Sequence, residues 1–506
     1  MSARRLLPSL SDCLFISLLA WLFAAGSGWT GLLADGDTGW HIRTGEFILD
    51  HGEFPQRDLF SFSRPDEPWF AWEWLADVAF AWVHRLAGLK GVVLLAGVAA
   101  CASVWLVFRH MLWRGANALL ALLVCLVGAG ASTIHYLARP HVFTLALAAA
   151  SLWLLDRDRR KATAAVWLLV PVAAVWVNVH GGFLALLACL ALVTAGTALE
   201  ELVNRARGER EWGQLRRYAG LFGACSLATL LNPYGVQLHV HIAGYLRSDW
   251  IREAVHEFQS PRFRSESAMQ FEILLFAGLL TAGSLLARRQ FTDALLVLFW
   301  AHAALTSVRH IPVFVVAASP VWTGEVSRIW SQWVQSRSRR SLAWALEGLS
   351  RDASGGFRRT SLWIPLAVLA LAWPGFPTKW PQDFPAEKFP TALIERHGAR
   401  LAAARVFTSD QWADYLIYRF YPQQRVFIDG RSDFYGEKLG KLYLRLAYAQ
   451  ADWPEAALKW GFSAVLAPSD WPLVSLLKRD PAWRLLAEEP RAVLFERVTA
   501  SPAKPD

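Results

Sequence analysis

Long apolar runs separated by short polar pieces dominate the chain from its start to about residue 375. Apolar runs of this kind predict helices that cross a lipid bilayer. The runs cover residues 12–33, 90–108, 115–131, 140–155, 162–178, 181–200, 218–232, 269–287, 291–308, 310–322 and 362–375. The pattern therefore predicts a polytopic α-helical membrane protein with about 11 spans.

The composition agrees with this prediction. Of the 506 residues, 54% are hydrophobic and only 18% are charged, with a mean hydropathy of +0.27. A soluble protein of this length carries more charge. The cysteines all lie in apolar runs without metal-ligand spacing, so they predict buried core residues and no disulfide framework: Cys13, Cys101, Cys125, Cys189 and Cys225.

The distribution of basic residues predicts the topology. With the N-terminus inside, the cytoplasmic pieces are 1–10, 109–114, 156–161, 203–217, 288–289 and 323–361, which carry 22 Lys and Arg. The outer pieces are longer in total and carry 10. This bias follows the positive-inside rule and places the part after the last span outside. The net charge of +9 therefore reflects topology, and we expect no nucleic-acid partner but a bacterial-type inner (plasma) membrane location.

The first outer loop, 34–89, concentrates polar residues. It holds ten Asp and Glu against four Arg. The segment from Leu33 to Gly52 contains an unusual set of charged side chains, namely Asp35, Asp37, His41, Arg43 and Glu46. The segment from Trp69 to Arg85 is rich in Trp and Phe, which predicts a helix in the membrane interface. A packing helix without any chemistry has the same composition.

The last part of the chain, 376–506, has no run long enough to span a membrane, so we expect domains at 1–375 (membrane) and 376–506 (periplasmic or otherwise extracytoplasmic). Strand-like and helix-like runs alternate there, which predicts a soluble α/β domain. The strand-like runs are 405–408, 425–429, 463–467 and 492–497, and the helix-like runs are 411–419, 438–449, 453–460 and 473–478. Residues 331–361 read as a basic cytoplasmic linker.

Polar residues at the ends of the predicted spans gather on the outer side. Beside the first loop, these include Arg139, His180, Arg309 and His310. Polar groups beside membrane spans are costly, so a shared face points to a site. A carboxylate there can act as a base, and Arg and His can bind a phosphate leaving group. A divalent metal, Mg²⁺ or Mn²⁺, is possible, with Asp35 and Asp37 as candidate ligands. Each residue alone also fits an ordinary turn, cap or interfacial role.

The first loop resembles that of GT-C glycosyltransferases, the multi-span enzymes that use polyprenyl-phosphate-linked sugars. Asp37, Trp40 and Arg43 match the acidic, aromatic and arginine spacing of oligosaccharyltransferase catalytic subunits. The likeness extends more distantly to protein O-mannosyltransferase-like enzymes. The aromatic helix after the loop, the odd span count and the outer C-terminal domain also agree.

The resemblance implies that Asp37 is the catalytic carboxylate or a metal ligand, with Asp35 beside it. It makes Arg139 and Arg309 the candidates for binding the lipid phosphate. We expect the following polar and aromatic residues of the outer face to bind substrate: Asp35, Trp40, His41, Arg43, Glu46, Arg139, His180, Arg309 and His310. The outer loop Ser132–Arg139 lacks the second acidic motif of oligosaccharyltransferases, which favours a metal-free site. In the tail, SDQWADYL resembles their peptide-binding motif only loosely, and VFIDGRSDFYG predicts a surface loop facing the site or a strand and turn.

We therefore expect a membrane glycosyltransferase of the cell envelope that moves a sugar, with inversion, from a polyprenyl-phosphate donor to a glycan, lipid or protein acceptor. Two other functions fit the sequence. A transporter or flippase for a lipid-linked or anionic solute would place charges near the bilayer midplane and show internal repeats. A non-catalytic envelope scaffold would not bring the outer polar residues together.

Overall fold

The computed structural model describes residues 7–23, 28–205, 212–357, 359, 361–376 and 378–498. The chain divides into two compact units, and each combines distant parts of the sequence. The bundle unit comprises the residues up to Gly28 together with Leu94–Gly244 and Arg252–Lys379. The loop–tail unit comprises Trp29–Val93, Tyr245–Ile251 and the residues from Trp380 onward.

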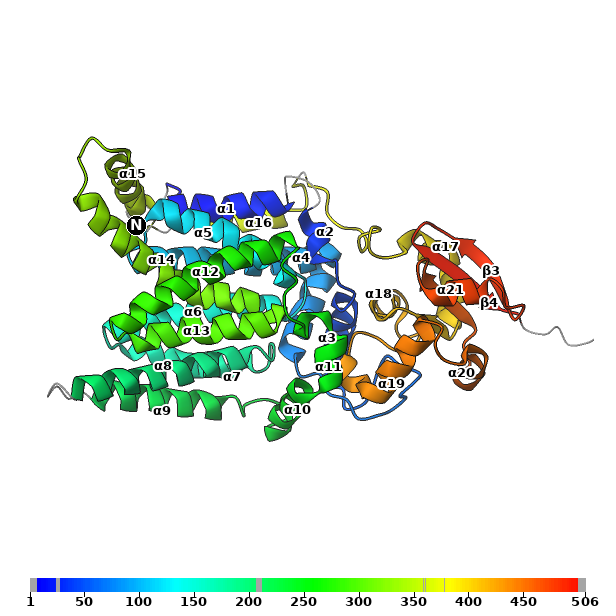
Figure 1. The fold of residues 1–506 in the computed structure, drawn as a ribbon. Coiled ribbons are helices and arrows are strands. Elements are labelled where there is room, and N and C mark those ends of the chain that lie inside the picture. The colour runs from blue at the N-terminus through cyan, green and yellow to red at the C-terminus, as the bar shows by residue number, and fades with distance from the viewer. Residues whose placement is uncertain are drawn as a thin grey trace, which may run out of the picture. The chain divides into compact units, whose positions relative to one another are not determined.

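The bundle unit is built from helices (Figure 1). Helix α13 packs against α8, α12 and α14, and α9 packs against α7 and α8. Its helices are α1 (Leu10–Phe23), the second part of α4 (Trp74–Trp113), α5 (Ala118–Ala131), α6 (His141–Arg160), α7 (Leu169–Trp176), α8 (Phe183–Arg205), α9 (Trp212–Ala228), α12 (Glu266–Ala287), α13 (Phe291–Thr306), α14 (Ile311–Gln335), α15 (Leu342–Phe357) and α16 (Trp363–Ala372).

Each of the eleven predicted spans contains a helix. Among the described residues, three helices are long and apolar enough to cross a membrane: Trp74–Trp113, Phe183–Val203 and Glu266–Ala287. The predicted interfacial helix at 69–85 begins later, at Trp74, and continues into the next span as α4. Non-helical backbone at Ala87 and Gly88 breaks α4 at the expected boundary.

The predicted linker at 331–361 is wrong for most of its length. Helix α14 continues to Gln335, and α15 occupies Leu342–Phe357. Helix α15 packs against α1, α5 and α14, so contacts with the bundle stabilise a segment whose Ser and Gly content disfavours a helix. Such tertiary stabilisation is not visible in local sequence.

The loop–tail unit joins the first loop to the C-terminal part. It contains α3 (Thr38–His51), the first part of α4, α17 (Thr391–Ala403), α18 (Asp410–Phe420), α19 (Ser432–Ala447), α20 (Trp453–Trp460) and α21 (Pro472–Leu477). The short helices α2 (Gly28–Leu32), α10 (Val236–Arg247) and α11 (Asp249–Ala254) lie where the chain passes between units.

A mixed four-stranded sheet has the order β1-β2-β4-β3. Strands β1 (Val406–Thr408) and β2 (Ala464–Pro468) are parallel, and β4 (Ala492–Arg497) is antiparallel to both β2 and β3 (Trp483–Glu488). The ring of Phe407 packs edge-on against Trp453 and is tilted against Phe462, which places an aromatic core beside the sheet.

Three of the four predicted strands are confirmed within a residue or two, but 425–429 is not a strand of this sheet. Val426 instead forms an isolated parallel bridge with Ser61 of the first loop. Two backbone bonds accompany the bridge, from Phe62 N–H to the Val426 carbonyl (2.9 Å) and from Val426 N–H to the Phe60 carbonyl (2.8 Å). A segment that pairs with a distant loop carries the same local signal as a sheet strand.

Candidate functional site

Three sequence motifs meet in the loop–tail unit at the backbone of Gly430. Asp37 precedes helix α3, Asp414 lies in α18, and Gly430 follows Asp429 in the VFIDGRSDFYG segment. The Gly430 N–H donates to Asp414 Oδ1 at 3.0 Å. A Cβ atom at Gly430 would overlap Asp37 Oδ1 and lie 2.9 Å from Asp414 Oδ2. The two carboxylates therefore lie side by side, in a space that only glycine leaves open.

The start of α3 packs directly on α18, which positions Asp37. A Cβ atom at Gly39 would lie 2.5 Å from the Asp414 carbonyl oxygen and 2.9 Å from the Tyr418 side chain. The Gly36 N–H also donates to Gln411 Oε1 at 2.8 Å. The glycines of the DGDTG stretch thus allow the two helices to approach at backbone distance.

Asp414 is fully buried, and Asp37 is only 4% exposed. Burial raises the pKa of Asp414 well above its usual range, and the neighbouring charges of Asp37 and Asp429 raise it further. Two carboxylates this close do not ionise independently, because the first charge disfavours the second. We therefore assign the shared proton to Asp414 and the negative charge of the pair to Asp37.

A buried arginine organises the turn that carries Gly430. Arg431 is 3% exposed and donates to Asp429 Oδ1 (2.8 Å) and Asp429 Oδ2 (2.6 Å). It also donates to Asp58 Oδ1 of the first loop at 2.8 Å, and its guanidinium lies 4.6 Å from the ring centroid of Trp69. Arg431 therefore joins the first loop to the tail segment beside the carboxylate pair.

The side chains at this site do not fit a metal ion. Among the described residues, no group of three or more His, Cys, Asp or Glu side chains is arranged to hold one. Asp429, whose charge also acts on Asp414, has both oxygens bonded to Arg431, and Tyr435 also donates to Asp429 Oδ2 at 2.7 Å. Asp35 accepts the Asp37 N–H at 3.0 Å.

The other predicted residues of the first loop lie on α3. The rings of Trp40 and His41 are tilted against each other with their centroids 3.6 Å apart, and His41 Nδ1 lies 2.6 Å from Asp77 Oδ1. Arg43 donates from Nε to the Tyr418 carbonyl (2.9 Å) and from Nη1 to Glu46 (2.6 Å). Arg43 thus satisfies a carbonyl near the end of α18.

The bundle unit holds a second group of polar residues, which includes the predicted Arg139, His180 and Arg309. It is here called the Arg–His cluster and consists of His135, Arg139, His141, His180, Glu257 and Arg309. Arg139 Nη1 pairs with Glu257 Oε1 at 3.1 Å. The Arg309 guanidinium lies 4.3 Å from the Phe258 ring centroid and forms no ion pair with any described residue. His310 belongs to the adjacent turn, where its Nδ1 lies 3.2 Å from the Ala303 carbonyl.

The histidines of this cluster lie in contact. The ring centroids of His135 and His141 are 4.5 Å apart, and those of His141 and His180 are 6.1 Å apart. Burial lowers the pKa of His135 to about 3 and that of His180 well below its usual value. His180 Nδ1 accepts the Gly182 N–H at 2.9 Å, which requires the neutral ring to carry its proton on Nε2.

The charges of the Arg–His cluster leave a net positive charge at neutral pH. Burial raises the pKa of Glu257, but Arg139 and Arg309 outweigh this and lower it overall, so Glu257 is ionised. Two arginines therefore face one carboxylate among neutral histidines. Such a cluster has the charge and the N–H donors to bind one anionic phosphate.

Sequence reasoning missed Glu257, Asp58 and the partnership of Asp37 with Asp414. Asp414 lies in the SDQWADYL segment and Gly430 in VFIDGRSDFYG, both of which stand out by their polar residues. Their contact with Asp37 depends on packing between the first loop and the C-terminal part of the chain, which a local sequence pattern cannot predict.

No protein-family model matches the sequence, and no curated protein matches it. The fold is similar to that of solved structures. The archaeal oligosaccharyltransferase AglB from Archaeoglobus fulgidus, in complex with an inhibitory peptide and a dolichol-phosphate, has a TM-score of 0.57 at 10% identity. The match covers 90% of this chain and 68% of AglB.

Two further structures show the extent of the likeness. The Archaeoglobus fulgidus enzyme tethered to an acceptor peptide matches with a TM-score of 0.53 at 11% identity, over 90% of this chain and 68% of that one. ArnT from Cupriavidus metallidurans, bound to undecaprenyl phosphate, has a TM-score of 0.49 at 13% identity, over 98% and 99% of the two chains. The likeness to the oligosaccharyltransferase structures shows a shared fold, which agrees with the resemblance of the first loop. The long apolar helices support a membrane location.

Proposed function

We propose that the protein is a glycosyltransferase that moves a sugar from a polyprenyl-phosphate-linked donor to an acceptor at the outer face of the membrane. The observation that carries this proposal is the Asp37–Asp414 carboxylate pair at Gly430. The GT-C-like fold supports it, because the AglB structure with that fold contains a dolichol-phosphate. In this proposal the tail from 376 onward lies outside the membrane.

The acceptor hydroxyl or amide attacks the anomeric carbon of the donor sugar. Asp37 takes the acceptor proton as general base, and the bond between the anomeric carbon and the phosphate oxygen breaks. The electron pair leaves with the polyprenyl phosphate. A single displacement of this kind inverts the anomeric configuration. The protonated Asp414 keeps the negative charge on Asp37.

Arg139 and Arg309 of the Arg–His cluster bind the phosphate of the donor in this proposal. Their charge balances the charge that develops on the leaving phosphate. His180 and His310 add neutral donors or acceptors. The remaining predicted residues of the first loop hold α3 against its neighbours and so position Asp37. This positioning role replaces the predicted substrate contact for Asp35, Trp40, His41, Arg43 and Glu46.

The test is sugar transfer by the purified full-length protein from a panel of polyprenyl-phosphate-linked sugars, measured as released polyprenyl phosphate. Asp37→Asn should lower turnover by about 10²- to 10⁴-fold, the usual contribution of a general base. Asp50→Asn is the matched control, because Asp50 lies on the same helix with its side chain 59% exposed. Turnover by Asp37→Asn at the rate of the control would contradict the proposal.

A further inference from the structure

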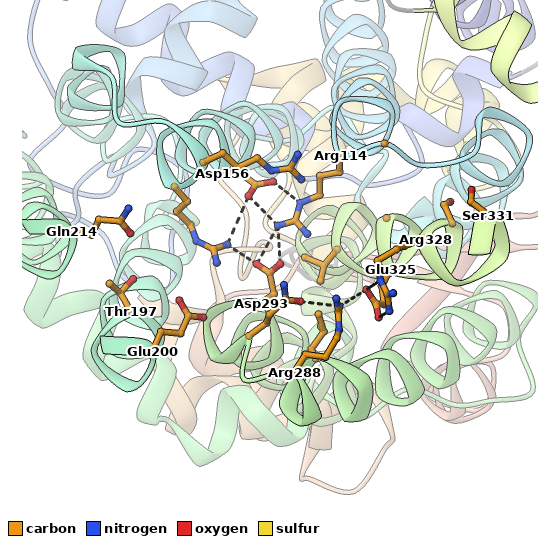
Figure 2. Close-up of a pocket in the computed structure, with 18 residues that line it drawn as sticks. Arg114, Asp156, Thr197, Glu200, Gln214, Arg288, Asp293, Glu325, Arg328 and Ser331 are labelled. Atoms are coloured by element: carbon orange, nitrogen blue, oxygen red, sulfur yellow. Dashed lines mark hydrogen bonds and ion pairs between the residues drawn. The ribbon is translucent and has the colours of Figure 1, made fainter. Parts of the chain in front are cut away.

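The bundle unit contains a cavity of about 610 Å³ that belongs to neither group of residues described so far. We call it the arginine cavity, because Arg114, Arg159, Arg160, Arg288 and Arg328 line it (Figure 2). It lies at the far end of the helices from the Arg–His cluster. Helix α6, 20 residues and therefore about 30 Å long, begins at His141 of that cluster and ends at Arg160 of the cavity.

The floor of the cavity is a fixed network of charges. Arg114 Nη2 donates to Asp156 Oδ1 at 2.9 Å and to Asp293 Oδ2 at 3.0 Å, and Figure 2 shows Arg114 reaching both carboxylates. Arg159 Nη1 also contacts Asp293, and His110 Nε2 lies 2.9 Å from Asp156 Oδ2. These contacts hold two guanidinium groups in place before any ligand arrives.

The walls carry arginines whose N–H donors are not all bonded to carboxylates of the described residues. Arg160 is exposed, lies 4.4 Å from the ring centroid of Trp113 and forms no ion pair with the residues that the structure describes. Arg288 uses only Nη2 for its bonds to Gln290 and Glu325, within the described part of the chain. A guanidinium has five N–H donors, so Arg160 and Arg288 keep donors for a further acceptor.

The lining combines this charge with neutral polar groups. Glu325 is shared by Arg288 and Arg328, while Glu200 accepts the Thr292 N–H at 2.9 Å. Five arginines against four acidic residues leave a positive excess. Gln214 and Ser331 add an amide and a hydroxyl. The volume is in the range of small-molecule sites, roughly 300–1,000 Å³.

We propose that the arginine cavity binds a phosphate group, carried by a small molecule or by a lipid headgroup. Planar guanidinium groups match phosphate oxygens in pairs, and a preset network lowers the cost of ordering them. The lining comes from the pieces whose basic residues predict a cytoplasmic position. This site is therefore separate from the outer-face chemistry and does not depend on the proposed transferase activity.

The test uses full-length protein with two probes that separate the sources of phosphate. Inorganic pyrophosphate is titrated into detergent-solubilised protein by calorimetry, and dioleoyl phosphatidic acid is added in mixed micelles and counted by native mass spectrometry. Binding of pyrophosphate assigns a soluble phosphorylated ligand, and binding of phosphatidic acid alone assigns a lipid headgroup. Failure of both probes to bind would overturn the proposal.

Two substitutions locate the binding. Arg160→Gln and Arg288→Gln should each weaken binding of the active probe by about tenfold, the effect of losing a charge-assisted hydrogen bond. Arg351→Gln is the control, because Arg351 lies on α15 outside the cavity with its side chain 67% exposed. Equal affinity in all three variants would refute the site.

Arg160 has no carboxylate partner among described residues, so its loss leaves the buried network intact. If Arg288→Gln does not fold, a protection experiment on the wild-type protein takes its place. Phenylglyoxal modifies accessible arginines, and peptide mass spectrometry measures whether the bound probe protects them. Protection at Arg160 and Arg288 supports the site. Modification that is unchanged by the probe contradicts it.

Discussion

Asp37 and Asp414, which are far apart in the sequence, lie side by side against the Cα of Gly430. The Gly430 N–H bonds Asp414 Oδ1, while Asp37 Oδ1 occupies the space where any other residue would place its Cβ atom. The first loop and the tail thus share one buried acidic pair. Because burial and mutual charge oppose ionisation of both groups, the pair keeps a proton that an isolated aspartate would lose.

Gly430→Ala should lower both stability and activity. Its methyl group would overlap Asp37 Oδ1 and press on Asp414, and overpacking of this kind costs about 1–3 kcal/mol. Thermal unfolding of the purified protein and the transfer assay measure the two effects. Gly31→Ala in the same unit meets open space and serves as the control. A Gly430→Ala protein that melts like the control would show that the carboxylates are not packed against this glycine.

Asp414→Asn should remove a pH dependence of stability. The pKa of Asp414 is raised in the folded state, so the folded protein holds this proton more tightly than the unfolded chain. The wild-type free energy of unfolding therefore falls as the pH rises from the ordinary aspartate pKa through the raised value. The neutral Asn avoids this loss and can still accept the Gly430 N–H.

The measurement is the Tm of both proteins between about pH 4 and pH 9. At the alkaline end the variant should melt a few degrees above the wild type, and the difference should shrink on acidification. Asp470→Asn, an exposed aspartate of the same unit, controls for general charge effects. Parallel Tm curves for wild type and Asp414→Asn would mean that Asp414 is ionised in the folded protein.

Arg431→Gln should destabilise the loop–tail unit strongly. The change leaves Asp58 and Asp429 buried without their cation, and breaking a buried ion pair costs about 3–5 kcal/mol. Chemical denaturation followed by tryptophan fluorescence reports the loss, since Trp69 lies against Arg431. The exposed Arg425→Gln is the control. Combining Arg431→Gln with Asp58→Asn should recover part of the stability, and a purely additive double variant would argue against the pairing.

Arg309→Gln should weaken donor binding more than it slows the chemical step. Arg309 forms no ion pair with described residues, so its charge remains available to a phosphate. We expect KM for the lipid donor to rise about tenfold, as for a lost charge-assisted hydrogen bond, with a smaller change in kcat. The exposed Arg262→Gln is the control. An unchanged KM would remove Arg309 from the donor site.

The affinity for the lipid donor should not show a histidine titration. Burial holds His135 at a pKa of about 3 and lowers the pKa of His180 well below its usual value, so both stay neutral at physiological pH. Histidine cations are thus not part of the phosphate site. Donor KM should be constant from about pH 5.5 to pH 8, where ordinary histidines titrate. A rise in KM through about pH 6.5 would show that one of them is charged when the donor binds.

Local sequence determined the helices of this protein and was enough to identify Asp37 as a candidate site residue. Apolar runs require backbone bonds within each segment, so a helix lies in every predicted span. Glycine and acidic residues packed into one short stretch singled out the first loop. Regular strands such as β2 and β4 were likewise visible in the pattern. Strand β3 was not, because a register shift between Leu485 and Ala487 breaks its alternation.

Only the tertiary structure decided what the polar residues do. Arg43 matches a family spacing, yet its guanidinium is bonded to the Tyr418 carbonyl of the tail. Asp414 and Gly430 acquire their relation to Asp37 through the packing of α3 on α18 and through the Arg431 network. The periodicity of apolar residues indicates which side of a helix or strand is buried. Pairing between distant segments depends instead on complementary shapes and charges, which come together only in the folded chain. For this reason the sequence pointed to Asp37 without its partner Asp414, which only folding supplied.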